Sequence, residues 1–208
     1  MSDPNAAAAE HYEHYDTVAN RIGMWLFLFT EVLMFGMLFL AYAVYLYQYK
    51  DQFQTAPALL NRPIGAVNTI ILLTSSLTMA LAIAAIQKAN KKRCLMFLLI
   101  TILCAAAFCV IKGFEWSAKF HHGIYPGSPL FEDMARGEVV FFGLYFVMTG
   151  IHALHVILGA LVILLAFFLV QKNKVNAERF SFLQNTGLFW HLVDLVWIYL
   201  FPLFYLVG

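Results

Sequence analysis

Five long apolar runs, separated by shorter polar stretches, make up most of the chain after residue 22. A helix needs roughly 20 mainly apolar residues to cross the hydrocarbon core of a bilayer. The pattern therefore predicts five transmembrane helices, at about residues 23–47, 64–87, 94–111, 139–170 and 186–207.

The N-terminal stretch, residues 1–22, is polar and acidic and differs from everything that follows it. It has neither the basic start nor the apolar centre of a cleavable signal peptide. We therefore expect a tail outside the membrane and a first span that itself directs insertion. No internal repeat or linker-like stretch interrupts residues 23–208, so the prediction is one all-α, polytopic membrane domain.

The composition agrees with a membrane protein. Hydrophobic residues make up 62% of the chain, charged residues 12%, and the mean hydropathy is +0.75. Such a chain cannot cover a soluble globule with a polar surface. The formal net charge is +1 and the sequence contains no basic stripe, which gives no reason to expect a nucleic-acid partner.

Basic residues mark the loop after the second span and the loop after the fourth. Cytoplasmic loops of membrane proteins carry an excess of lysine and arginine. With an odd number of spans, this rule predicts a cytoplasmic N-terminus and a C-terminus on the outer side. The residues concerned are Lys88, Lys91, Lys92, Arg93, Lys172, Lys174 and Arg179.

By these boundaries, Glu31 and Asp194 are the two carboxylates that lie well inside the membrane. A charge at that depth costs about 2.5 kcal/mol or more, so such residues are usually paired, turned inward or functional. Each stands about eight residues from the cytoplasmic start of its helix, a depth of roughly 12 Å. They either face a common cleft or act as ordinary hydrogen-bonded packing groups.

Histidines supply the other polar groups within the spans. His152 and His155 are three residues apart on one helix, a spacing that allows metal ligation but favours hydrogen bonds between helices. The intramembrane histidines are too few for two bis-histidine haems. Asp194 lies between Trp190 and Trp197 on one helical stripe, and His191 or a histidine of the fourth span is its expected partner.

Five motifs carry a family resemblance. In this order and spacing, WLFLFTEVLMFG, NTIILLTSSLTM, KGFEW, MTGIHALHVILG and WHLVDLVW resemble subunit III of the haem-copper terminal oxidases, the cytochrome c oxidase subunit 3 family. The likeness covers nearly the whole chain after the tail. Some members have seven helices, whereas a shorter bacterial form lacks the first two, and this chain resembles the shorter form.

The resemblance implies a fold in which a two-helix bundle and a three-helix bundle enclose a lipid-filled cleft. It also implies a subunit of the bacterial inner membrane that holds no haem, copper or other metal. Such a subunit binds phospholipid and subunit I directly, and joins subunit II and others in a complex. That complex reduces oxygen to water and pumps protons, with haem and copper in the partner subunits.

The same resemblance suggests which residues matter, none of them catalytic. In the family, the acid that matches Glu31 reacts with hydrophobic carbodiimides, and the subunit supports proton uptake and protects the active site of subunit I. The positions carried over to the lipid cleft, to proton uptake or to structural polar contacts are Glu31, His152, His155, His191, Asp194 and Trp197, with Glu115 of KGFEW as an addition.

Several alternatives remain open at the level of sequence. The family includes quinol oxidase subunits and a relative associated with nitric oxide reductase, although glutamate at position 31 resembles the cytochrome c branch. A lipid-binding scaffold without a role in proton uptake is a close rival. A proton-coupled secondary transporter is a rival of another class, but transporters usually show repeats and broken helices.

Two further expectations concern the cleft. Glu31 has apolar neighbours in sequence, so we expect a neutral carboxyl group that hydrogen-bonds His152 or His155 and supports the oxidase without conducting the pumped protons. We also expect phospholipids between a bundle of the first two spans and a bundle of the last three.

Overall fold

The chain is helical throughout in this computed structural model, and no strand occurs among the described residues. The structure describes residues 4–121, 123–125, 127–129 and 134–207, with side chains from residue 19 onward. The expected tail, residues 1–22, therefore lies mostly outside the described side chains and stays a prediction. The elements are α1 (Pro4–Gln48), α2 (Lys50–Thr55), η1 (Ala56–Leu59), α3 (Arg62–Gln87), α4 (Lys91–His121), α6 (Arg136–Gln171), α7 (Ser181–Phe201) and η2 (Pro202–Leu206).

Five helices are long and apolar enough to cross a membrane, which confirms the predicted all-α, five-helix architecture. The main difference in bounds is at the end of the third span, expected at residue 111 and found at His121. The helix continues because the charged residues of this last part pair with one another or lie buried, so they do not break the packed face. The apolar spans are Ala19–Gln48, Arg62–Gln87, Lys91–His121, Arg136–Gln171 and Ser181–Leu206.

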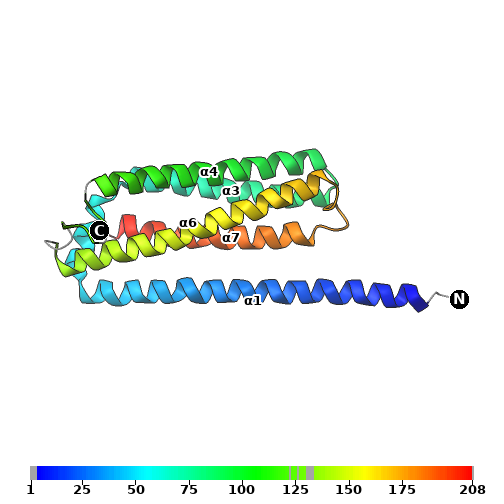
Figure 1. The fold of residues 1–208 in the computed structure, drawn as a ribbon, viewed down its shortest axis with the longest axis horizontal. Coiled ribbons are helices and arrows are strands. Elements are labelled where there is room, and N and C mark those ends of the chain that lie inside the picture. The colour runs from blue at the N-terminus through cyan, green and yellow to red at the C-terminus, as the bar shows by residue number, and fades with distance from the viewer. Residues whose placement is uncertain (1–3, 122, 126, 130–133, 208) are drawn as a thin grey trace.

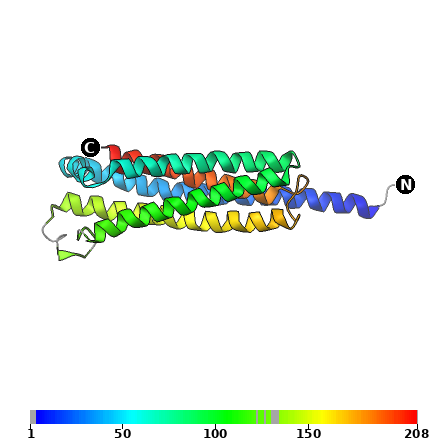
Figure 2. The ribbon, with the colours of Figure 1, turned by 90° about the horizontal axis from the view of Figure 1, so that it is seen from above.

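Four helices, α3, α4, α6 and α7, form a closed bundle in which each packs against two neighbours. α1 stands beside this bundle and touches mainly α6 and α7, as Figures 1 and 2 show. The expected division into a two-helix and a three-helix bundle is therefore wrong, because the second span, α3, belongs with the last three. No boundary separates the first two spans from the last three, so lipid cannot lie between them as predicted.

Connections and small residues explain why α3 joins the bundle. Only residues 88–90 separate α3 from α4, and so short a link makes the two helices antiparallel neighbours. α2 and η1, by contrast, separate α1 from α3. Small residues on α3 and α6 let aromatic side chains of the last helix approach closely: an added Cβ would lie 2.9 Å from Phe201 at Gly65 and 2.8 Å from Trp190 at Gly159.

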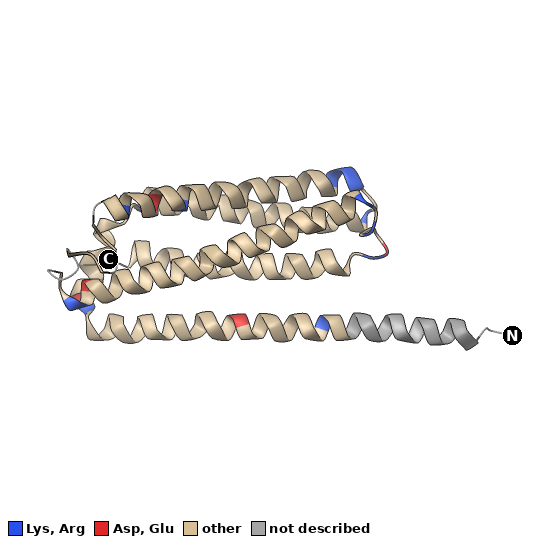
Figure 3. Cartoon of the chain, in the orientation of Figure 1, with Lys and Arg blue, Asp and Glu red and all other residues tan. Residues whose placement is uncertain are grey.

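The alternating directions of the helices bring both basic loops to one end of the molecule. We call this the basic end, defined by residues 88–93 and 172–179, and Figure 3 shows its lysines and arginines together. The N-terminal end of α1 points the same way, and the C-terminus lies at the opposite end (Figure 1). This arrangement is the one that the predicted orientation requires, and the orientation itself stays a prediction.

Candidate functional site

Glu31 of α1 hydrogen-bonds His155 of α6, with 2.9 Å between Oε2 and Nε2. Their side chains are 15% and 12% exposed, so the pair lies half-buried where α1 meets the bundle. The Phe35 ring stands edge-on to the imidazole, with 5.4 Å between the ring centroids. The expected partner of Glu31 on the fourth span is therefore confirmed, and it is His155.

The geometry limits how protons can be distributed between Glu31 and His155. Nδ1 of His155 lies 2.7 Å from the Ile151 carbonyl oxygen, which can only accept, so Nδ1 carries a proton. One proton then remains between Nε2 and the Glu31 carboxyl group. Either a neutral acid donates to a neutral imidazole, or an imidazolium donates to a carboxylate, and the pair has no net charge in both cases. This neutrality explains how a thinly covered helix tolerates a glutamate at membrane depth.

α1 has few other attachments to the bundle. Tyr42, whose side chain is fully buried, donates a hydrogen bond of 2.7 Å to the Leu203 carbonyl oxygen. Toward the basic end, the Phe27 ring packs against Phe189 with 5.7 Å between centroids. Only 11% of the residues in the most apolar stretch of this span are buried inside the structure. Among the described side chains of α1, Glu31 and Tyr42 therefore provide the hydrogen bonds to the bundle.

Apolar grooves flank α1 on both sides. One has a volume of about 380 Å³ and runs between α1, α6 and α7, with Phe27, Leu158 and Phe189 in its lining. Two others, of about 340 and 280 Å³, lie between α1 and α7 and share Val32 and Leu195. Linings of this kind suit acyl chains, since they offer apolar surface and few polar groups.

Asp194 does not have the histidine partner expected for it. Its side chain is 3% exposed, and no hydrogen bond of ordinary geometry reaches either carboxylate oxygen from the described residues. His191 hydrogen-bonds Ser76 instead, with 2.7 Å between Nδ1 and Oγ. The same Ser76 hydroxyl is the hydrogen-bonding group beside the Asp194 carboxyl group. The prediction of a histidine–aspartate pair is wrong because α3 supplies a closer partner for the imidazole.

His152 also differs from expectation. It is fully buried, and neither ring nitrogen finds a hydrogen-bond partner among the described residues. Its ring instead stacks on Trp197, with 5.2 Å between centroids and 29° between planes. A spacing of three residues turns two side chains about 60° apart on a helix, enough to point His155 at α1 and His152 into the bundle. The hydrogen bond between helices expected of both is found for His155 alone.

The metal ligation that the histidine spacing left open finds no structural support. Within the part of the chain that the structure describes, no group of three or more histidine, cysteine, aspartate or glutamate side chains is placed to hold a metal ion. His152 and His155 point to different neighbours, as the preceding contacts show.

Glu115 belongs to a buried polar network that sequence reasoning missed. Lys112 pairs with it over 2.9 Å, and both side chains are about 4% exposed or less. The third span was predicted to end at residue 111, before Lys112 and Glu115, whereas the apolar helix continues to His121 and includes both residues. The signal was present in KGFEW, where lysine and glutamate stand at i and i+3 and the apolar pattern continues.

The network closes on two tyrosines from other elements. The Lys112 ammonium donates to Glu115 and to the hydroxyls of Tyr145 on α6 and Tyr205 in η2, at 2.9, 3.2 and 2.7 Å. Each tyrosine in turn donates to Glu115 Oε1, at 3.0 and 2.6 Å. All three ammonium protons and the carboxylate are thereby satisfied, and the charges cancel. The network joins α4, α6 and the C-terminal segment far from the basic end.

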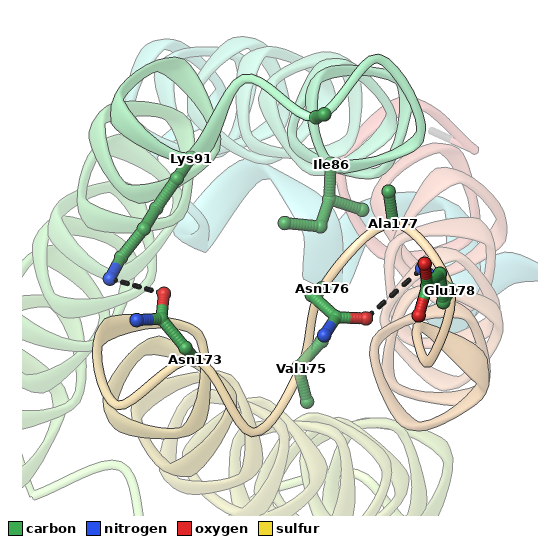
Figure 4. Close-up of a pocket in the computed structure, with 8 residues that line it drawn as sticks. Ile86, Lys91, Asn173, Val175, Asn176, Ala177 and Glu178 are labelled. Atoms are coloured by element: carbon green, nitrogen blue, oxygen red, sulfur yellow. Dashed lines mark hydrogen bonds between the residues drawn. The ribbon is translucent and has the colours of Figure 1, made fainter.

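At the basic end, the two loops meet around a pocket of about 310 Å³, shown in Figure 4. Lys91 donates to the Asn173 side chain at 2.7 Å and to the Gln171 carbonyl oxygen at 2.8 Å. The Asn176 side chain accepts from the backbone of Glu178 and so shapes the second loop. Ile86 and Val175 form the apolar part of the lining.

The seven residues expected at the site thus fall into four places. Glu31 and His155 lie between α1 and the bundle. His152, Asp194 and Trp197 are buried within the bundle, and His191 bonds Ser76 and lines the groove of about 340 Å³ beside α1. Glu115 lies in the network far from the basic end. The common cleft left open for Glu31 and Asp194 does not form, since Asp194 is enclosed by the bundle.

Comparison with known proteins agrees with this architecture. Residues 5–208 match the family described as Cytochrome c oxidase subunit III. The chain is 31% identical to the cytochrome bo(3) ubiquinol oxidase subunit 3 of Pseudomonas aeruginosa, over 100% of this chain and 95% of that protein. It is 30% identical to the cytochrome c oxidase subunit 3 of Bacillus sp. strain PS3, over 90% of this chain and 85% of that one.

A third relative is longer. The heme-copper oxidase subunit I+III of Aeropyrum pernix is 32% identical over 95% of this chain, which corresponds to 24% of that protein. The match of a single family to residues 5–208, together with five apolar helices in the expected order, leads to one conclusion: this chain is a multi-pass membrane protein and belongs to the cytochrome c oxidase subunit III family.

Proposed function

We propose that this chain is the subunit III of a proton-pumping haem-copper terminal oxidase, without a redox centre of its own. In this role it binds phospholipid, stabilises subunit I and supports proton uptake while the complex reduces oxygen to water. Family membership supports the general role. The observation that carries the specific role is the Glu31–His155 hydrogen bond, a net-neutral polar fastening between α1 and the bundle with apolar grooves on both sides.

Subunit I is the proposed direct partner, and subunit II and other subunits join through the complex. The Aeropyrum pernix relative, named as subunit I+III, supports this because it combines the two subunits in one chain. Many apolar side chains of α1 are exposed, among them Trp25, Met37 and Leu40, and they require lipid or protein neighbours in the membrane.

Phospholipid is the proposed occupant of the grooves beside α1. Their apolar linings match acyl chains, and the half-buried Glu31–His155 pair separates them without adding a net charge. We place the basic end on the cytoplasmic side of a bacterial inner membrane, where its lysines and arginines face anionic headgroups. Under this orientation, the Lys112 network lies toward the outer surface.

Cytochrome c is the proposed electron donor of the complex, since glutamate at position 31 resembles that branch. A quinol oxidase is the second candidate, favoured by the 31% identity over the whole chain to a subunit of a ubiquinol oxidase. Either electron donor binds to other subunits of the complex, so the proposed role of this chain is the same for both candidates.

Purification of the native complex tests the proposal. We expect the chain to copurify with a haem-copper subunit I, with a haem spectrum and oxygen uptake supported by reduced cytochrome c. Uptake with quinol alone would select the second candidate. Expressed by itself in detergent, the chain should show no Soret absorbance and no stoichiometric iron or copper. Stoichiometric haem on the isolated chain, or proton-coupled transport by it, would overturn the proposal.

A further inference from the structure

A groove of about 290 Å³ runs along the surface of the bundle between α3 and α4, at the basic end. The last turns of α3, the first turns of α4 and the short link between them supply its lining. The grooves beside α1 are lined by α1, α6 and α7, so this groove is a separate surface.

Polar and apolar side chains divide the length of this groove. Lys88 and Arg93 line its end nearest the loop, where Figure 3 shows the positive charge of the basic end. Leu81 lies about 10 Å from Lys88 along the axis of α3, and Met96 lines the facing part of α4. Leu77, one turn farther along α3, is 60% exposed and extends the apolar surface toward the middle of the membrane. The groove thus has a charged end and an apolar end.

The two cations at the charged end have no partner in the part of the chain that the structure describes. From those residues, no hydrogen bond or ion pair reaches the side-chain nitrogens of Lys88 or Arg93. Both side chains are exposed, and the described residues that line the groove include no aspartate or glutamate. The charged end of the groove is therefore complementary to an anion.

The pocket of about 310 Å³ at the same end of the molecule provides a contrast (Figure 4). Its lysine, Lys91, already donates to the Asn173 side chain and to the Gln171 carbonyl oxygen. Its lining also includes the acidic residue Glu178, which would repel a phosphate group. Of these two pockets, the groove between α3 and α4 is the one that offers uncompensated positive charge.

The link between the two helices holds the charged end in shape. The backbone N–H of Lys88 donates to the Ala84 carbonyl oxygen at 3.3 Å, and that of Asn90 donates to the Ala85 carbonyl oxygen at 2.9 Å. The Asn90 side chain in turn accepts from the backbone N–H of Arg93 at 3.2 Å. These bonds join the end of α3 to the start of α4, so both cations project from a tight turn.

A phospholipid with an anionic headgroup matches this division of the groove. Basic pockets between transmembrane helices on the cytoplasmic side bind such headgroups, and arginine can pair with a phosphate group through two N–H donors. The apolar part of the groove offers its surface to an acyl chain. An acidic segment of another subunit would satisfy the cations but would not match the apolar surface that continues past Leu81.

We propose that the groove between α3 and α4 binds an anionic phospholipid, whose phosphate group pairs with Lys88 and Arg93 and whose acyl chain lies along Leu81 and Leu77. This site goes beyond the grooves beside α1, whose linings contain no lysine or arginine and therefore do not select an anionic headgroup. It does not depend on the electron donor, on the role of Glu31 or on the identity of the neighbouring subunits.

Native mass spectrometry of the chain, purified with its native partners into lipid nanodiscs, tests this site. The nanodiscs contain phosphatidylcholine with a smaller share of phosphatidylglycerol in both leaflets, so the result does not depend on orientation. We expect the wild type to retain phosphatidylglycerol in a larger share than the nanodiscs contain. A chain that purifies without oxidase subunits can be measured in the same way, so failure of the proposed function leaves this test intact.

The variant Lys88→Gln with Arg93→Gln should lose the bound phosphatidylglycerol and keep its phosphatidylcholine. Each cation near an anionic headgroup contributes roughly fivefold to affinity, so the double change should weaken binding roughly 30-fold. Lys172→Gln with Lys174→Gln is the matched control, because it removes two exposed cations from the other loop of the same end. No loss in the first variant would overturn the proposal, and so would an equal loss in the control.

Ala84→Phe gives a second test that keeps both cations, and it decides the outcome if the charge variant does not assemble. Ala84 is an exposed residue of the lining, so the larger ring fills the groove and should displace the same phosphatidylglycerol. Val67→Phe, at an exposed position near the other end of α3, should retain it. Retention of phosphatidylglycerol in Ala84→Phe, or polypeptide in place of lipid in a map of the complex, would overturn the proposal.

Discussion

At the scale of single residues, Glu31 and His155 share one proton in a pair without net charge. Glu31→Gln keeps the shape and lets the amide donate to His155 Nε2, so we expect the complex to assemble, reduce oxygen at most of its initial rate and pump protons. Glu31→Leu leaves Nε2 without its partner, at a cost of about 1 to 3 kcal/mol, and should loosen the subunit or shorten the working life of the enzyme.

Proton pumping per electron in freshly prepared enzyme checks this prediction. Glu138→Gln, which alters a carboxylate in the first turn of α6, is the control and should behave as the wild type. If Glu31→Gln abolished pumping with the subunit still bound, Glu31 would lie on the transfer path and the supporting role would be refuted.

A second prediction at this scale concerns Lys112 and Glu115. Lys112→Met leaves a buried carboxylate without its cation, and the loss of one partner of such a pair costs about 3 to 5 kcal/mol. The double variant Lys112→Met, Glu115→Leu removes both charges, so it should recover most of the lost stability. The thermal midpoint of subunit loss from the purified complex measures both. A double variant as unstable as the single one would show that the charges are not the source of the effect.

At the scale of elements, α1 is held by few polar contacts, and Tyr42 is the one nearest the C-terminal segment. Tyr42→Phe removes its hydrogen bond to the Leu203 carbonyl oxygen, worth about 0.5 to 1.5 kcal/mol. We expect a broader distribution of distances between spin labels on α1 and α6. Tyr47→Phe is the matched control, because this tyrosine is 91% exposed. Equal broadening in both variants would mean that Tyr42 does not fasten α1.

At the scale of the whole molecule, lipid in the grooves is the feature to test. Leu158→Trp places a larger side chain in the groove of about 380 Å³, so we expect fewer phospholipids retained per complex in native mass spectrometry. Leu103→Trp, on an exposed position of α4, changes the same side chain away from the grooves and should retain the wild-type number. Unchanged lipid content in Leu158→Trp would count against phospholipid in this groove.

Much of the architecture follows from sequence because it depends on local properties of the chain. The length of each apolar run determines that a helix can span, and the basic loops determine which ends lie together. The partner of Glu31 can be narrowed to two histidines because the fourth span carries two imidazoles well inside the membrane. The end of α4 was misplaced because Lys112 and Glu115 read as loop residues when their burial is not known.

The sequence by itself determined the all-helical class, the five spans and the short set of polar residues within them, since hydrophobic periodicity and the cost of intramembrane charge act on each segment separately. Only the tertiary structure decided which helices pack together and where each polar side chain points. α3 joined the four-helix bundle, His155 turned to Glu31 and His152 turned inward, because these outcomes depend on helix rotation and on contacts with residues far away in the chain.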